Sequence, residues 1–371
     1  MKIAIEKAHL SSALGRVARV VESRNTYPIL SNVLLSAADG RLSLRATDLD
    51  IEITESVPAL VSTAGVTTVP ARTLASIVSK MPNGAEISIE VTGEQAIVKS
   101  GRSRIQLATL SPDSFPDLKS GKFEHEFTIG AAALLRLIGK TAFAISTEET
   151  RYYLNGIYMH TIEVNKETVL RAVATDGHRM ARCQMSAPAG SEGMPGVIVP
   201  RKTVSEIQKM LSGIDIDVSV EVSESKIRFT IGETVLLSKL IEGTFPDYER
   251  VTPKANNKVV TVGRNDLAKA LDRVSIIASD RGGKAVKFAF ADAGLTLEVT
   301  NPDHGTANED LELADGIGDF DIGFNARYCA DILGALDTDK ARFAFNDAGS
   351  PTLIQDQDDA TSLFVLMPMR V

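Results

Sequence analysis

Hydrophobic residues recur along the chain with two periods, which predict six helices set among many short strands. The first helix is expected over residues 7–22, where one face carries Leu10, Ala13, Leu14, Val17 and Val21. Further helices are expected over residues 71–81, 131–145, 201–212, 264–279 and 325–338. Between them apolar and polar residues alternate, as in 41–45 and 49–53, which is typical of strands with one wet face. The pattern predicts an α+β fold with antiparallel sheets.

The same motifs return three times in the same order. Three helices open with Val69-Pro70-Ala71-Arg72, Val199-Pro200-Arg201-Lys202 and Phe324-Asn325-Ala326-Arg327. A second set consists of Ala46-Thr47-Asp48, Ala174-Thr175-Asp176 and Val299-Thr300-Asn301, and a third of Ser114-Phe115-Pro116-Asp117 and Thr244-Phe245-Pro246-Asp247. A repeat of about 125 residues indicates three copies of one domain. We expect domains over 1–120, 126–249 and 258–371, with linkers between them.

Composition narrows the class of protein. The chain has 371 residues, of which 44% are hydrophobic and 24% charged, as expected for a globular protein of two or three domains. Cys183 and Cys329 are far apart and fit a reducing cytoplasm better than a disulfide framework. The sequence shows neither a signal peptide nor an apolar stretch long enough for a membrane helix, so a cytoplasmic protein without a membrane partner is expected.

The net charge of −8 argues against nucleic acid until its distribution is considered. The six predicted helices hold 14 Lys and Arg against 6 Asp and Glu, so they carry +8 and the rest of the chain −16. Exposed helices are commonly rich in lysine, and this explanation suffices for the helices alone. Combined with the repeat, the asymmetry suggests basic helices on one side of an arc. Two such chains closed head to tail would enclose a hole of roughly 25–27 Å, wide enough for duplex DNA held through its phosphates.

Several polar clusters have structural explanations. Asp176-Gly177 is a turn signal, and His178 lacks the nucleophile or metal ligands that acid–base chemistry would need. Asp48, Asp50 and Glu52 alternate with apolar residues and are expected on the solvated face of a strand. The segment Gly282-Gly283-Lys284 lacks the remaining residues of a phosphate loop. No catalytic residue, cofactor or metal site is therefore expected.

Four motifs carry a family resemblance: Arg151-Tyr152-Tyr153-Leu154-Asn155-Gly156, Ala174-Thr175-Asp176-Gly177-His178-Arg179-Met180, Phe245-Pro246-Asp247-Tyr248 and Met367-Pro368-Met369-Arg370-Val371. They closely resemble the bacterial DNA polymerase III beta subunit, the sliding clamp, and the likeness spans the chain. The resemblance implies a non-catalytic homodimeric ring around duplex DNA, closed head to tail and loaded by a clamp loader using ATP. It also implies a pocket for peptides of the polymerase III alpha subunit, the clamp loader delta subunit and other clamp-motif proteins.

Site residues follow from the resemblance position by position. The implied peptide pocket consists of Leu154, Thr175, Gly177, His178, Arg179, Met180, Pro246, Arg250, Val251, Val365, Met367, Pro368 and Met369. The implied DNA contacts are Arg24, Tyr152, Tyr153, Arg201 and Lys202, and the dimer contact sets Ile105 and Leu107 against Ile276 and Ile277. Three positions depart from the common pattern: Met180 stands for Leu, Pro351 for a small polar residue and Glu148 for Gln.

Two other classes of function compete with the clamp. One is an enzyme that uses His178 and nearby acids, although a threefold repeat disfavours a unique active site. The other is a repeat-built scaffold, or a clamp paralogue without a replicative role. Retention on circular DNA distinguishes an encircling clamp from a scaffold.

Overall fold

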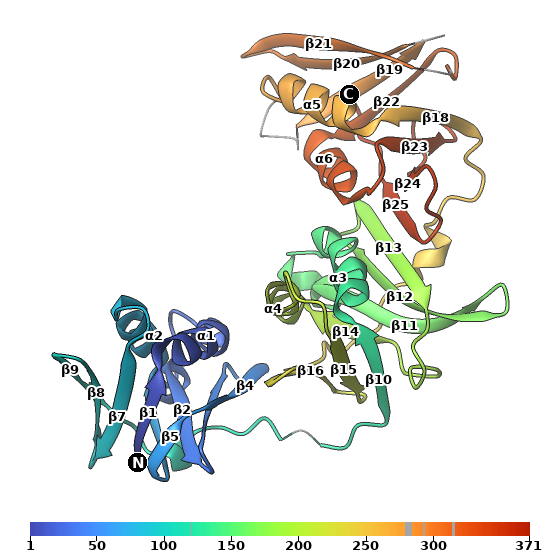
Figure 1. The fold of residues 1–371 in the computed structure, drawn as a ribbon. Coiled ribbons are helices and arrows are strands. Elements are labelled where there is room, and N and C mark those ends of the chain that lie inside the picture. Colours follow the sequence, from blue (N-terminus) through green and yellow to red (C-terminus); the bar gives the residue numbers. More distant parts are fainter. Residues whose placement is uncertain (120, 279–283, 292–293, 314–315) are drawn as a thin grey trace. The chain divides into compact units, whose positions relative to one another are not determined.

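All six predicted helices form. The computed structural model describes residues 1–371 except 120, 279–283, 292–293 and 314–315, so Gly282 and Gly283 of the incomplete phosphate-loop motif lie outside the described residues. The helices are α1 Lys7–Val17, α2 Ala71–Lys80, α3 Ala131–Gly139, α4 Arg201–Leu211, α5 Arg264–Val274 and α6 Ala326–Ala335 (Figure 1). Within the described ranges, no helix is both long and apolar enough to cross a membrane.

Four helices, α1, α3, α5 and α6, end three or more residues earlier than their apolar pattern predicts. After α1 the chain tightens into a 3₁₀ turn, Ala18–Val20, and then becomes extended at Val21. Val20 and Val21 are still fully buried, so the apolar period continues although the α-helix has ended. A similar turn, Ala142–Ala144, follows α3, and α5 ends at Val274. Ile276 and Ile277 therefore lie beyond α5 and not within it.

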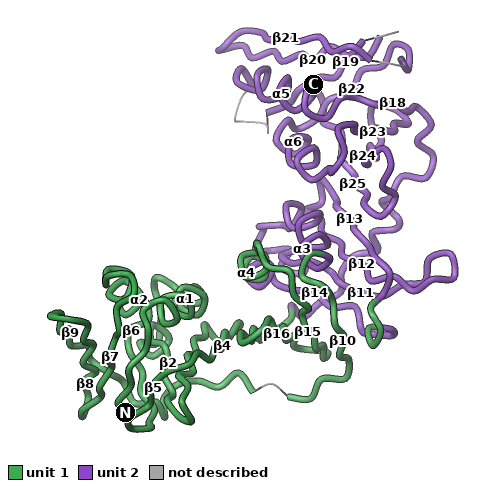
Figure 2. The backbone as a smooth tube through the Cα atoms, viewed as in Figure 1, with its two compact units in different colours: residues 1–132, 188–191, 205–240 green, residues 133–187, 192–204, 241–371 purple. Residues whose placement is uncertain are grey.

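The first compact unit comprises residues 1–132, 188–191 and 205–240 (Figure 2). It contains a five-stranded sheet, β5-β1-β7-β8-β9, and an eight-stranded sheet, β10-β15-β16-β17-β4-β3-β2-β6, both antiparallel. The strands of the five-stranded sheet are β1 Lys2–Glu6, β5 Leu60–Thr63, β7 Glu86–Thr92, β8 Gln95–Ser100 and β9 Ser103–Ala108. Those of the larger sheet are β2 Asn32–Ala38, β3 Arg41–Thr47, β4 Ile51–Pro58, β6 Gly65–Pro70, β10 His125–Gly130, β15 Asp217–Val222, β16 Lys226–Ile231 and β17 Thr234–Lys239.

The second compact unit comprises residues 133–187, 192–204 and 241–371. Its eight-stranded sheet has the order β14-β11-β12-β13-β25-β24-β23-β18, and its four-stranded sheet the order β21-β20-β19-β22. The first sheet is built from β11 Gly156–Val164, β12 Glu167–Thr175, β13 Arg179–Ser186, β14 Val197–Pro200, β18 Lys258–Gly263, β23 Lys340–Phe345, β24 Thr352–Asp356 and β25 Ser362–Leu366. The second is built from β19 Ala285–Ala291, β20 Gly294–Asn301, β21 Gly305–Glu312 and β22 Phe320–Asn325.

The threefold repeat explains this topology. Each copy supplies two four-stranded blocks, which in the first copy are β6-β2-β3-β4 and β1-β7-β8-β9. The equivalents of the first block are β14-β11-β12-β13 in the second copy and β22-β19-β20-β21 in the third. The equivalents of the other block are β10-β15-β16-β17 and β18-β23-β24-β25. Consecutive copies join edge to edge, through β4 with β17 and through β13 with β25. Each eight-stranded sheet therefore contains strands from two copies of the repeat.

The Thr-Asp motifs form the same turn in the first two copies. The Thr47 hydroxyl donates to the carbonyl of Ile51 at 2.9 Å, and the Thr175 hydroxyl donates to that of Arg179 at 2.7 Å. The residue after each Asp has a positive φ, +82° at Leu49 and +88° at Gly177. The repeat seen in the sequence is thus a repeat of local structure.

The prediction of a solvated strand face at Asp48–Glu52 is wrong. The strand starts only at Ile51, because Asp48 accepts hydrogen bonds from the backbone N–H groups of Asp50 and Ile51 at 2.9 and 2.8 Å. Glu52 is only 8% exposed, since β17 pairs with this part of β4. Burial raises the pKa of Glu52, and the nearby Arg45 opposes that shift.

Candidate functional site

A groove of about 320 Å³ opens in the second unit where the two halves of its eight-stranded sheet meet. It lies at the start of β13 and the end of β25, where Met180 pairs with Val365. Two 3₁₀ segments, Glu149–Leu154 and Tyr248–Arg250, contribute to its walls. The lining residues are Arg151, Tyr153, Leu154, Thr175, Gly177, Arg179, Met180, Pro246, Asp247, Tyr248, Val251, Val365 and Met367.

The groove is apolar at its base and partly open at its mouth. Its base belongs to a buried cluster of Leu154, Val173, Met180, Ile198, Phe245, Tyr248, Leu363 and Val365. At the mouth, Val251 is 54% exposed and Met367 is 39% exposed. Apolar side chains held open beside a packed base, with a few polar groups at the rim, suit a ligand that contributes apolar side chains.

Arg179 connects the base of the groove to α6 and to the 3₁₀ turn that follows α3. Its guanidinium donates to Asp331 at 2.6 Å, to Asp176 at 3.0 Å and to the carbonyl of Phe143 at 2.6 Å. It also lies 4.2 Å from the ring centre of Tyr328. With only 9% of its surface exposed, Arg179 acts mainly as a support.

The C-terminal residues dock onto the second unit through two backbone hydrogen bonds. The Met367 N–H donates to the carbonyl of His178 at 2.9 Å, and the Met369 N–H donates to that of Gly323 at 2.8 Å. Met367 is thereby held at the groove, next to the turn that follows β12.

Gly177 allows this turn to form beside Arg151. A Cβ at Gly177 would lie 2.6 Å from Nη1 of Arg151, and its φ of +88° is strained for other residues. Arg151 itself donates to Glu148 at 2.8 Å, and this bond lowers the pKa of Glu148. Glu148, the residue that replaces Gln, is therefore paired with a groove residue.

We expect Gly177→Ala to destabilise the turn and weaken ligand binding, because the left-handed backbone costs a residue with a Cβ about 1–2 kcal/mol. Gly334→Ala is a matched control, since that helical position has open space and no positive φ. Denaturant unfolding and peptide titration of both variants measure the effect. Equal stability and affinity in the two would contradict it.

The structure brings together most, but not all, of the implied pocket residues. Nine line the groove: Leu154, Thr175, Gly177, Arg179, Met180, Pro246, Val251, Val365 and Met367. His178, Arg250, Pro368 and Met369 are not among the lining residues. His178 stacks near Tyr328, with ring centres 6.4 Å apart, and the exposed Arg250 pairs with Asp247 at 2.9 Å.

Four lining residues were not predicted: Arg151, Tyr153, Asp247 and Tyr248. All four lie inside the quoted motifs, so their proximity to Leu154 and Pro246 was the signal available in the sequence. Tyr153, predicted to contact DNA, lines the groove. Its neighbour Tyr152 is 55% exposed, and the two rings meet edge to face at 5.8 Å.

The other predicted contacts lie at the surface to different degrees. Arg24 and Arg201 are exposed, while Lys202 is half-buried. Ile276 is 77% exposed, the most of any large apolar residue in the described structure. Ile105 and Ile277 are half-buried, whereas Leu107 is buried within its own unit.

The first repeat has different side chains at the positions equivalent to the groove. Leu49 occupies the place of Gly177 and Glu52 that of Met180, as the matching Thr-Asp turns show. Lys239 occupies the place of Met367, because its N–H likewise donates to the turn, at the carbonyl of Asp50. Charged and bulky side chains thus replace the apolar lining in that copy.

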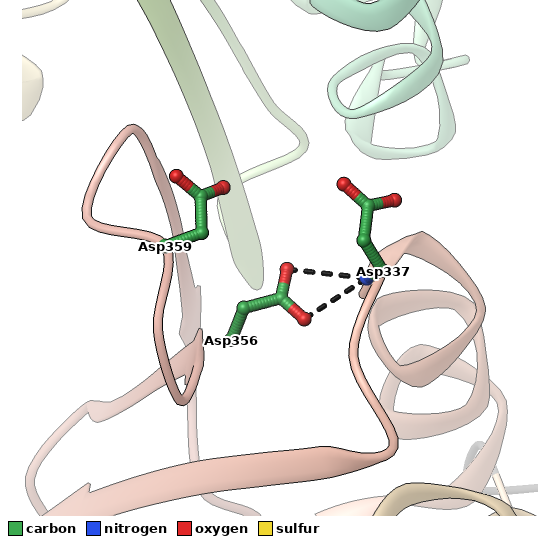
Figure 3. A group of neighbouring side chains, drawn as sticks. All are labelled: Asp337, Asp356 and Asp359. Atoms are coloured by element: carbon green, nitrogen blue, oxygen red, sulfur yellow. Dashed lines mark hydrogen bonds between the residues drawn. The ribbon is translucent and has the colours of Figure 1, made fainter.

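Three carboxylates, Asp337, Asp356 and Asp359, approach one another elsewhere in the second unit (Figure 3). Their charge is met by nearby cations: Lys140 lies 2.9 Å from Asp337 and Arg136 lies 2.6 Å from Asp359. Asp356 also accepts from the backbone N–H of Asp337 at 2.9 Å (Figure 3). The cluster is an ion-pair network that connects the C-terminal end of α3 to β24 and to the loops beside it.

Three tandem copies of one antiparallel α+β domain, with an apolar groove where two copies join, define a DNA clamp. Three family models match in order: the N-terminal, central and C-terminal domains of the DNA polymerase III beta subunit, over residues 1–119, 128–247 and 249–370. The beta sliding clamps of Caulobacter vibrioides and Escherichia coli are 47% and 40% identical, with all of each chain covered. A DnaN sliding clamp of Bartonella birtlesii, solved bound to griselimycin, matches over the full length of both chains with a TM-score of 0.98 and 49% identity.

The chain belongs to the DNA polymerase III beta subunit family, the beta sliding clamps. Members of this family are non-catalytic processivity factors of DNA polymerase III, so DNA and the polymerase are the partners of this protein in replication. The alternatives of an enzyme or of a scaffold without a replicative role are not favoured.

Proposed function

We propose that two copies of the chain close head to tail into a ring around duplex DNA, and that the groove binds peptides of the proteins the ring tethers. The ligands are segments of the polymerase III alpha subunit, the clamp loader delta subunit and other clamp-motif proteins. The domains are assigned to 1–120, 126–249 and 258–371. A replication factor acts where the bacterial chromosome is, so we place the protein in the cytoplasm.

The sheet topology is the observation that most supports closure of two chains into a ring. The first copy joins the second through β4 and β17, and the second joins the third through β13 and β25. By the same rule, β21 of the third copy should pair with β9 of a first copy. Both strands are open edges of their sheets, β9 in the first unit and β21 in the second. A second chain supplies the missing partner for each edge, which gives two equivalent contacts and a closed dimer.

Side chains at these two edges complement one another. Exposed Arg104 lies on β9, whereas β21 carries exposed Asp310 and Glu312. Ile276, exposed after α5, offers apolar surface near β21, against which α5 packs. We assign Ile105, Leu107, Ile276 and Ile277 to the dimer contact. Its main apolar area comes from the third domain, where Ile276 is exposed and Ile277 is half-buried.

We assign the DNA contacts to Arg24, Tyr152, Tyr153, Arg201 and Lys202. The predicted helices carry a net +8 within an acidic chain, which would direct phosphate to a helix-lined hole. Such contacts are independent of sequence and weak singly, so the ring can slide.

For the groove, the ligand class follows from its lining. The apolar base suits a terminal Leu-Phe-like pair, and the polar rim residues can orient a Gln that precedes a Leu. The Bartonella birtlesii relative was solved bound to griselimycin. We propose that this chain binds griselimycin as well.

Retention on circular DNA tests the ring. Protein loaded by a clamp loader with ATP should stay on nicked circular DNA and run off once the circle is cut. Free protein should bind short linear duplex weakly, with affinity falling steeply as salt rises. Gel filtration before and after restriction cleavage measures the bound fraction. Equal retention on cut and uncut DNA would rule out encirclement.

A further inference from the structure

Tyr248 lies between the groove and a buried polar network on β11 and β12. Its side chain lines the groove and is only 6% exposed. Nη1 of Arg171 on β12 donates to the Tyr248 hydroxyl at 2.9 Å, and Nε2 of His160 on β11 lies 2.9 Å from the same oxygen. His160 and Arg171 are direct cross-strand partners.

The hydrogen-bonding capacities of these groups are all met by one arrangement of donors and acceptors. Arg171 can only donate, so the Tyr248 oxygen accepts from it. The Tyr248 hydroxyl is then free to donate to His160, which accepts at Nε2 in its neutral form. The other ring nitrogen, Nδ1, lies 3.4 Å from the carbonyl of Thr161. All three side chains are therefore satisfied with a neutral His160.

Arg171 is itself held firmly. It donates to Gln184 of β13 through Nε at 3.0 Å and Nη2 at 2.7 Å, and to Glu249 through Nη1 at 2.6 Å. Glu249 also lies 3.7 Å from Arg182 of β13. Two successive residues of the 3₁₀ segment, Tyr248 and Glu249, are thus tied to the sheet.

These ties matter because residues 246–251 form one whole wall of the groove without belonging to a strand. Pro246, Asp247, Tyr248 and Val251 all come from this segment. Its own backbone bonds are weak, such as the 3.3 Å bond from the Val251 N–H to the carbonyl of Tyr248. The side-chain network adds polar attachments to the sheet beside the apolar packing of Phe245 and Tyr248.

The network is specific to the repeat that carries the groove. In the first repeat, the cross-strand pair equivalent to His160 and Arg171 is Ser36 and Ser43. There Leu118 stands where Tyr248 follows the Phe-Pro-Asp motif. The polar network is therefore not needed to build the domain fold, which both copies share.

We propose that Arg171, His160 and the Tyr248 hydroxyl are positioning residues, which hold the wall formed by residues 246–251 ready for a partner peptide. This inference rests on the proposed peptide-binding function of the groove. A fixed wall spares the peptide the cost of ordering it, so loss of the network should weaken binding without removing any lining side chain.

Acid should disturb the same network. Burial lowers the pKa of His160 and the charge of Arg171 lowers it further, while the Thr161 carbonyl and Glu249 raise it. Arg182, Tyr248 and the stacked Tyr158 also face this cluster. Because the pKa is lowered on folding, the contribution of His160 is complete above its ordinary value of 6.5 and is lost as the pH falls through the lower, folded value. A protonated Nε2 can no longer accept from Tyr248.

The test measures binding of a fluorescein-labelled peptide, with Gln-Leu and a terminal Leu-Phe pair, to the full-length protein by anisotropy. Tyr248→Phe keeps the ring and should bind about five-fold more weakly, as expected for one buried hydrogen bond. Arg171→Met should weaken binding at least as much. Tyr158→Phe is the matched control, because Tyr158 packs in the same cluster and its hydroxyl is not part of the network.

A pH series separates positioning from general destabilisation. Wild-type affinity should fall as the pH drops through the lowered pKa of folded His160. His160→Gln should keep its affinity at neutral pH and lose that part of the pH dependence, since Gln accepts from Tyr248 without titrating. Melting temperature and dimer mass are measured for each variant. Unchanged peptide affinity in both Tyr248→Phe and Arg171→Met, or equal losses in Tyr158→Phe, would overturn the inference. Failure of wild-type protein to bind the peptide would instead overturn the proposed function.

Discussion

Replacing both Ile276 and Ile277 with alanine is expected to convert the ring into monomers that no longer stay on circular DNA. Ile276 is 77% exposed in the isolated chain, so its apolar surface gains burial only through a partner. Burying an isoleucine contributes about 2 kcal/mol, and the ring contains the contact twice. Because opening either contact releases DNA, a loss of several kcal/mol at the interfaces should abolish retention rather than reduce it slightly.

Sedimentation at micromolar concentration measures this change directly. Leu60→Ala provides the matched control, since Leu60 is 70% exposed on β5, at the opposite edge of the sheet from β9. The control should remain a dimer and stay on nicked circles. A double variant that sediments as an unchanged dimer would show that the contact has been assigned to the wrong residues.

Deleting Met367–Val371 is expected to remove most peptide affinity while leaving the ring intact. The deletion takes away Met367, which lines the groove, and the backbone bonds that dock the tail on His178 and Gly323. Met367→Ala is the milder test and should weaken peptide binding by about 1–3 kcal/mol, as for truncation of a buried anchor.

Arg370→Ala controls for a general effect of changing the tail, because Arg370 is exposed and does not line the groove. Anisotropy with a labelled peptide measures affinity, and sedimentation checks the dimer. Peptide affinity that survives the deletion in a protein that is still dimeric would place the binding site elsewhere.

The local pattern of the sequence determined the helices and the repeat. Apolar spacing located all six helices, because a helix that covers a sheet must bury one face whatever its tertiary neighbours are. The motifs before α2, α4 and α6 marked the starts of those helices at Ala71, Arg201 and Ala326. The ends were less well predicted, since buried residues such as Val20 continue the apolar pattern through a 3₁₀ turn.

Pairings between distant strands were decided only by the tertiary structure. Glu52 alternates with apolar residues like a solvated side chain, yet β17 of the next repeat covers it. The groove likewise depends on the pairing of β13 with β25. The network that holds its wall depends on the pairing of His160 with Arg171, which brings both side chains to the Tyr248 hydroxyl. Periodicity specifies which face of a strand is apolar, but the partner that buries or supports that face is set by register across the whole sheet.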